Sequence, residues 1–86
     1  MVFLSRITES KQMNLVGHNV KKFRLARKLT QKQVSDKLET LAVYVCRGSI
    51  ARIESKTRTV TDVELWGLSM VLDVPIYDFF DTLNKK

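Results

Sequence analysis

The fold is decided by two stretches, Leu29-Thr30-Gln31 and Arg47-Gly48-Ser49-Ile50-Ala51-Arg52-Ile53-Glu54. The first predicts the start of a helix, because Thr30 is a good N-cap residue and Gln33 follows three positions later, as in a capping box. The second predicts a short helix with Ile50 and Ile53 on its inner face and arginines on its outer face. The chain therefore places a capped helix shortly before a helix that exposes basic side chains.

Working outward, apolar residues recur at helical spacing and no strand pattern of any length is present, so we expect an all-α fold of five helices. The expected helices span residues 15–27, 30–41, 47–55, 61–72 and 75–83. Residues 42–46 are expected to be an apolar connection lying on the core. The fourth helix opens with a second capping box, Thr61 and Glu64, and Pro75 can occupy the first turn of the last helix.

The chain of 86 residues is long enough for one domain with a modest core. We assign residues 14–84 to this domain and residues 1–13 to an N-terminal arm with weak periodicity. The expected core residues come from all five helices: Val16, Val20, Phe23, Val34, Leu38, Leu41, Ile50, Ile53, Leu65, Leu68, Leu72, Ile76, Phe79, Phe80 and Leu83.

Composition argues against several functional classes. One cysteine and one histidine leave no intramolecular disulfide, no zinc finger, no metal site and no Ser/His/Asp or Cys/His catalytic arrangement. There is also no glycine-rich phosphate loop, so we expect neither an enzyme nor a cofactor. No apolar run approaches the roughly 20 residues of a membrane span, and the first residues lack the pattern of a signal peptide. A soluble cytoplasmic protein without membrane contact is expected.

The positive charge is concentrated in the middle of the chain. Residues 21–58 hold eleven lysines and arginines against three acids, a balance of +8, whereas residues 59–86 have a balance of −3. Residues 1–20 contribute +1, which completes the net charge of +6. A basic region on a small domain favours a polyanionic partner, although a merely solvated basic surface is the alternative.

The two opening stretches together predict a helix-turn-helix, in which the second helix is presented to the DNA major groove. Their order resembles the helix-turn-helix regulators of the phage repressor and Cro type, often called Xre-like, over about Val16 to Phe80. In this resemblance the expected helix 15–27 matches through Val16-Gly17, Val20 and Phe23-Arg24, and the start of the expected helix 30–41 matches through Leu29-Thr30-Gln31. The second helix of the motif matches through Ile50 and Ile53-Glu54, and the closing helix through Val74-Pro75-Ile76-Tyr77-Asp78-Phe79-Phe80.

This resemblance implies a five-helix repressor-like domain that acts as a sequence-specific, double-stranded DNA-binding transcriptional regulator. Three positions depart from the pattern. Lys28 replaces a glycine that would supply a positive φ, so a strained or differently shaped turn is expected. The connection before Arg47 is longer than the usual tight turn by about five residues. Cys46 replaces the usual serine N-cap and is a poorer cap.

The expected recognition helix, about residues 47–55, supplies the candidate base-reading residues: Arg47, Gly48, Ser49 and Arg52. Arginine can donate two hydrogen bonds to guanine O6 and N7, and the small Gly48 and Ser49 let the helix approach the base edges. Solvated or phosphate-bound arginines, and a Gly48 that merely weakens the helix, are the alternatives.

The candidate phosphate-binding residues lie at the start of the expected helix 30–41 and in the loop after the recognition helix: Gln31, Lys32, Lys56, Arg58 and Thr59. A solvent-facing Gln31 is the alternative at that position. Arg24 and Glu54 are assigned a structural role, because the family resemblance implies a partly buried ion pair that links the expected helix 15–27 to the recognition helix.

A homodimer on DNA is expected, because domains of this type usually bind pseudo-palindromic sites. Its surface could come from Phe79, Phe80 and Leu83, from the segment Val2-Phe3-Leu4, or from Trp66, which is otherwise at the edge of the core. Cys46 is expected to be a small half-buried residue rather than a redox sensor. The alternative function is a protein-binding module, such as an antitoxin or an anti-regulator, that uses the apolar segment from Leu41 to Val45.

Overall fold

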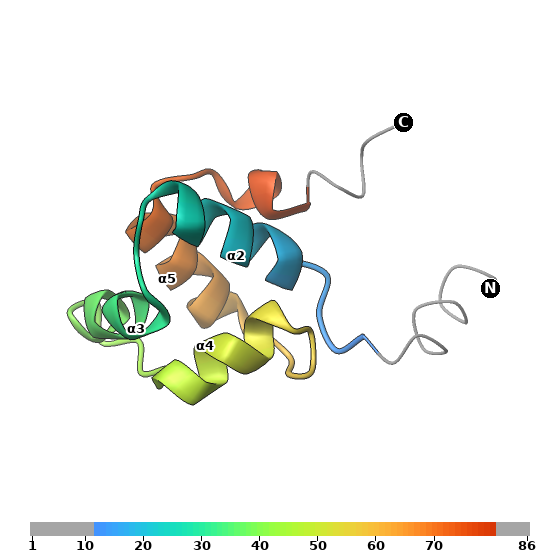
Figure 1. The fold of residues 1–86 in the computed structure, drawn as a ribbon, viewed down its shortest axis with the longest axis horizontal. Coiled ribbons are helices and arrows are strands. Elements are labelled where there is room, and N and C mark those ends of the chain that lie inside the picture. The colour runs from blue at the N-terminus through green and yellow to red at the C-terminus, as the bar shows by residue number, and fades with distance from the viewer. Residues whose placement is uncertain (1–11, 81–86) are drawn as a thin grey trace, which may run out of the picture.

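The computed structural model describes residues 12–80 and is all-helical there, with no strand, as predicted (Figure 1). Its elements are α2 (Gly17–Ala26), α3 (Gln31–Glu39), α4 (Arg47–Glu54), α5 (Asp62–Leu72) and the 3₁₀-helix η1 (Ile76–Phe80). The described part thus holds four α-helices, and the expected fifth is a 3₁₀-helix of five residues. Residues 81–83, expected to extend it, lie outside the described residues, as does most of the expected arm.

Both predicted capping boxes are confirmed. The Thr30 hydroxyl accepts from the Gln33 amide at 3.0 Å, and the Gln33 side chain accepts from the Thr30 amide at 2.8 Å. Thr61 and Glu64 exchange the same two bonds at the start of α5, each at 3.1 Å. These bonds satisfy amide groups that have no partner within the helix, so they fix where α3 and α5 begin.

The start of α2 differs from the prediction, because the helix begins at Gly17 rather than at Leu15. Asn14 is the cause. Its side-chain oxygen accepts from the amides of Val16 and Gly17, at 3.0 and 2.7 Å, and holds residues 14–16 in a turn before the helix. The same side chain donates to the carbonyl oxygens of Ile53 and Arg58, so it also attaches this turn to the end of α4.

Each α-helix is followed by a non-glycine residue with a positive φ: Lys28 at 59°, Ala42 at 62°, Lys56 at 67° and Asp73 at 57°. The turn at Lys28 therefore has the left-handed conformation that glycine would provide. A residue with a Cβ atom adopts it at a cost of roughly 1 kcal/mol. Of the two alternatives expected at this position, a strained turn and a differently shaped one, the positive φ supports the strained turn.

The core lies between the four α-helices and η1. Figure 1 shows α2 between η1 and α4, and α3 beside both α4 and α5. The fully buried side chains are Val20, Val34, Leu38, Ile50, Ile53, Leu68, Leu72 and Phe79. Ile76, predicted to face inward, is 40% exposed. The prediction assumed an α-helix, but η1 is a 3₁₀-helix with about three residues per turn, so its side chains point in other directions than those of an α-helix.

The connection between α3 and α4 lies on the core, as expected. Val43 and Val45 are buried while Tyr44 between them is 75% exposed, which is the alternation of an extended segment. α3 ends at Glu39 rather than at Leu41, because a turn closed by bonds from the amides of Leu41 and Ala42 follows it. The two buried valines anchor this long connection and so determine where α4 starts.

Candidate nucleic-acid interface

Helix α4 has one buried and one exposed face. Ile50 and Ile53 are fully buried, whereas Arg47, Gly48 and Arg52 are exposed. Cys46 occupies the N-cap position, and its side chain makes no capping hydrogen bond, as expected from its poor capping ability. The predicted base-reading residues therefore share the outer part of α4, with Ser49 half-buried at their centre.

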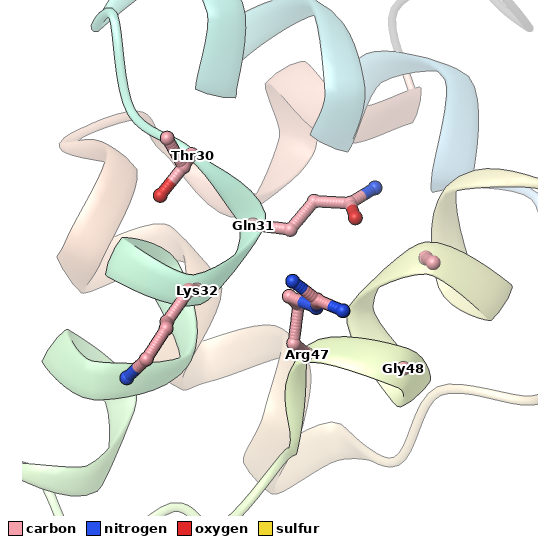
Figure 2. A pocket seen from close by; sticks show the side chains of 6 residues that line it. Thr30, Gln31, Lys32, Arg47 and Gly48 are labelled. Atoms are coloured by element: carbon pink, nitrogen blue, oxygen red, sulfur yellow. The ribbon is translucent and has the colours of Figure 1, made fainter.

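A depression of about 510 Å³ separates the start of α3 from the first turns of α4. Its lining residues are Thr30, Gln31, Lys32, Arg47, Gly48 and Ala51. Figure 2 shows the side chains of Gln31 and Arg47 in the space between the two helices, one from each side. The structure thus brings a predicted base-reading arginine next to the predicted phosphate-binding residues of α3.

The Ser49 hydroxyl accepts hydrogen bonds from two exposed side chains. Arg52 Nη2 donates to it at 3.1 Å and Cys46 Sγ at 3.5 Å. The pKa of the Cys46 thiol is lowered, chiefly because the Ser49 hydroxyl can in turn donate a hydrogen bond to the deprotonated sulfur. Cys46 is exposed rather than half-buried as expected, because the extended segment that buries Val45 turns the next side chain outward.

Arg24 and Glu54 form a buried ion pair, with side chains that are 9% and 4% exposed. Arg24 Nε and Nη2 donate to the two carboxylate oxygens at 2.6 and 3.1 Å, and its Nη1 donates to the carbonyl of Leu29 at 2.8 Å. Gln31 Nε2 adds a fourth bond, to Glu54 Oε1 at 3.1 Å. This network, defined by Arg24, Glu54, Gln31 and the Leu29 carbonyl, joins α2, α3 and α4.

Gln31 was predicted to donate to a phosphate, but in the free protein its side chain is half-buried and donates to Glu54. One amide hydrogen remains available, since the side-chain amide carries two donors. Lys32 is exposed and pairs with Asp36, one turn later, at 3.2 Å. An exposed pair of this kind contributes little to stability, so Lys32 can exchange Asp36 for another anion.

The loop after α4 is held differently from the prediction. Arg58, expected to bind phosphate, donates to both carboxylate oxygens of Glu64 at 2.8 Å and to the carbonyl of Thr59 at 2.8 Å. The bond from Arg58 lowers the pKa of Glu64, and the bond to Glu64 raises the pKa of Arg58. Lys56 is half-buried, and Thr59 is exposed.

Sequence reasoning missed two residues that position this loop, Asn14 and Glu64. Each acts through hydrogen bonds to residues that lie elsewhere in the fold, and no local sequence pattern indicates such contacts.

Within residues 12–80, no group of three His, Cys, Asp or Glu side chains could hold a metal ion. None of the helices described there has the length and apolar character needed to cross a membrane.

Helices α3 and α4 pack against each other, and α4 exposes Arg47 and Arg52. This arrangement fits the class of helix-turn-helix proteins. The sequence pattern of a helix-turn-helix family matches residues 20–79, which are 60 of the 86 residues. The chain belongs to this family, the helix-turn-helix family of the Xre, Cro and cI type. No curated protein matches the chain.

Proposed function

We propose that this chain is a sequence-specific transcriptional regulator that binds double-stranded DNA and inserts α4 into the major groove. The observation that supports this most directly is the exposure of Arg47 and Arg52 on the side of α4 opposite Ile50 and Ile53. The family also consists of DNA-binding regulatory domains. The balance of +8 over residues 21–58 gives the domain the charge that a DNA backbone attracts.

In this proposal the residues of the interface divide by role. Arg47 and Arg52 read base edges, and Gly48 and Ser49 leave room for that approach. Gln31, Lys32, Lys56 and Thr59 contact the phosphate backbone, which orients the protein without reading sequence. Arg58 is assigned first to positioning the loop, because its Nη1 and Nη2 atoms both donate to the Glu64 carboxylate.

We further propose that two copies bind one operator in the cytoplasm, since paired recognition helices multiply affinity and specificity. Phe79 is fully buried and cannot supply the dimer surface. Leu83 and Val2-Phe3-Leu4 lie outside the described residues. The exposed apolar residues of α5 are Val63, Trp66 and Met70, and we place the contact between copies there.

The alternative, a protein-binding antitoxin or anti-regulator, takes the extended apolar segment from Leu41 to Val45 as its contact site. Val43 and Val45 are buried and Leu41 is half-buried, so Tyr44 is the one large apolar side chain of that segment that is exposed. No observation on this segment favours the alternative over DNA binding.

The test is selection of bound sequences from a random pool of duplex DNA with the full chain. We expect a short consensus with two related half-sites, and an affinity for it that falls steeply as salt rises. Enrichment without any consensus would contradict sequence-specific recognition. Failure to bind any duplex at low salt would contradict the proposal as a whole.

A further inference from the structure

Within residues 12–80 four residues other than glycine have a positive φ, and two of them are lysines at the two ends of the helix-turn-helix. Lys28 lies just before α3, and Lys56 lies just after α4. Glycine would adopt either conformation without strain but would carry no charge. Ala42 and Asp73 have the same backbone conformation without a positive side chain, so the conformation itself does not require lysine.

The two lysine turns are connected through one buried network. The Leu29 carbonyl, next to Lys28, accepts from Arg24, and Arg24 binds Glu54, two residues before Lys56. Gln31 at the start of α3 binds the same Glu54 carboxylate. The start of α3 and the end of α4 are therefore adjacent, and the network that separates the two lysines is fixed by its hydrogen bonds.

Each turn is also held by its own backbone. The Lys28 amide donates to the Leu25 carbonyl at 3.0 Å, and the Leu29 amide donates to the Arg24 carbonyl at 3.1 Å. The Lys56 amide donates to Ile53 and its carbonyl accepts from Met13, at 3.0 and 2.9 Å. Among residues 12–80 neither lysine has an ion-pair partner, although Arg24, Lys32 and Arg58 each have one.

We propose that Lys28 is a further DNA-backbone contact that acts together with Lys56, so that two rigid lysine turns bind phosphates on either side of the Arg24–Glu54–Gln31 network. This inference rests on the proposed function and extends it beyond the residues assigned there. An ammonium group on a fixed turn loses less freedom on binding than one on a mobile loop, and it meets a phosphate as a point charge. In this proposal lysine, rather than the unstrained glycine, occupies the left-handed turn because its positive charge lies beside the start of α3.

The test compares Lys28→Gly with Ala42→Gly in the full chain. Both substitutions relieve a left-handed residue, so both should raise the thermal midpoint. We expect only Lys28→Gly to weaken DNA binding, on the order of tenfold at about 50 mM salt, with a salt slope shallower by about one unit. The loss should be similar for the selected operator and for an unrelated duplex, since a phosphate contact reads no sequence.

Lys28→Arg serves as the rescue variant, because it keeps both the charge and the strain and should retain the wild-type salt slope. If Lys28→Gly had the same DNA affinity and salt slope as the wild type, the inference would be overturned. The proposed function would still stand in that case, because the wild-type chain binds DNA. A wild-type chain that binds no duplex would instead contradict the proposed function itself. A Lys28→Gly protein that loses affinity for the operator alone would also overturn the phosphate role.

Discussion

Arg47 and Arg52 differ in how free their side chains are. Arg52 already donates one hydrogen bond to Ser49, while Arg47 lies in the depression between α3 and α4. An arginine fork has five donors, so Arg52 can keep this bond and still offer others to a base. Ser49 therefore restricts the direction of Arg52, and Arg47 is the less restricted of the two.

We predict that Arg47→Ala and Arg52→Ala each weaken binding to the selected operator by about 1–3 kcal/mol, the worth of a bidentate base contact. Binding to an unrelated duplex should fall much less. Titrations with both duplexes measure the difference. Lys21→Ala is a suitable control, because Lys21 is an exposed lysine on α2, outside both α3 and α4. If both arginine variants kept the wild-type sequence preference, α4 would not be the helix that reads the bases.

Arg58 and Glu64 give a prediction that depends on pH. Arg58 lowers the pKa of Glu64 in the folded protein. The pair therefore stabilises the fold fully above the usual glutamate pKa of about 4.3, and this contribution is lost as the pH falls through the lower folded pKa. Arg58→Ala should reduce the free energy of unfolding by about 1–2 kcal/mol at neutral pH, between the values for exposed and buried pairs.

Denaturant unfolding at pH 7 and at pH values below about 4 measures this effect, and the difference between wild type and Arg58→Ala should shrink in acid. Lys32→Ala breaks an exposed pair and should change stability by less than about 0.5 kcal/mol. A stability unaffected by Arg58→Ala, together with a shallower salt slope of DNA binding, would return Arg58 to the phosphate-binding role that its place in the sequence suggested.

At the scale of the elements, Arg24 and Glu54 decide how α4 is held against α2. Both side chains are buried, and every buried side-chain nitrogen and oxygen in the described part of the chain has a hydrogen-bond partner. Removing one member would leave the other buried without its charge partner, which costs far more than the loss of a surface pair. The orientation of α4 relative to α2 thus depends on Arg24 and Glu54, which are not themselves proposed to contact DNA.

We predict that Arg24→Ala lowers the free energy of unfolding by about 3 kcal/mol and also weakens DNA binding. A double-mutant cycle with Glu54→Ala isolates the interaction, and we expect a coupling energy above about 1 kcal/mol. Coupling near zero would show that the pair does not hold α4 in solution. Lys32 and Asp36 provide the matched cycle for an exposed pair, where coupling should be about 0.5 kcal/mol or less.

The parts of the fold that follow from local sequence were predictable. Thr30 with Gln33 and Thr61 with Glu64 are contacts across three residues, so the sequence identifies them directly. The buried faces of α3 and α4 follow from helical periodicity. The pairing of Arg58 with Glu64 was not predictable, because Glu64 already had a local role in a capping box and nothing in the sequence shows that its carboxylate also faces the loop after α4.

The same reasoning explains the misplaced boundaries. Asn14 shortens α2 at its start through bonds that also reach Ile53 and Arg58, about forty residues away in the sequence. Periodicity alone cannot reveal such a side chain. Cys46, expected to be half-buried, is exposed because side chains alternate along the extended residues 43–46.

At the scale of the whole molecule, an apolar surface on α5 remains exposed. Val63, Trp66 and Met70 are 57%, 44% and 56% exposed and stand at positions i, i+3 and i+7, on one face of the helix. A helix with apolar side chains on most of its circumference normally has each of them covered. A stable interface buries roughly 800 Å² of surface on each partner, far more than these three side chains can supply. The proposed dimer should therefore be weak in solution and form mainly on DNA.

We predict that Met70→Glu reduces the affinity for the complete operator much more than the affinity for a single half-site. A charge in the contact between copies opposes its twin across the symmetry axis, and binding of the second copy should lose its cooperativity. Leu25→Glu is the matched control, because Leu25 is a 55% exposed apolar residue on α2. Titrations of both duplexes, with thermal unfolding to confirm that each variant folds, measure the effect. If Met70→Glu and Leu25→Glu bound the complete operator with the same cooperativity as wild type, the two copies would not meet through α5.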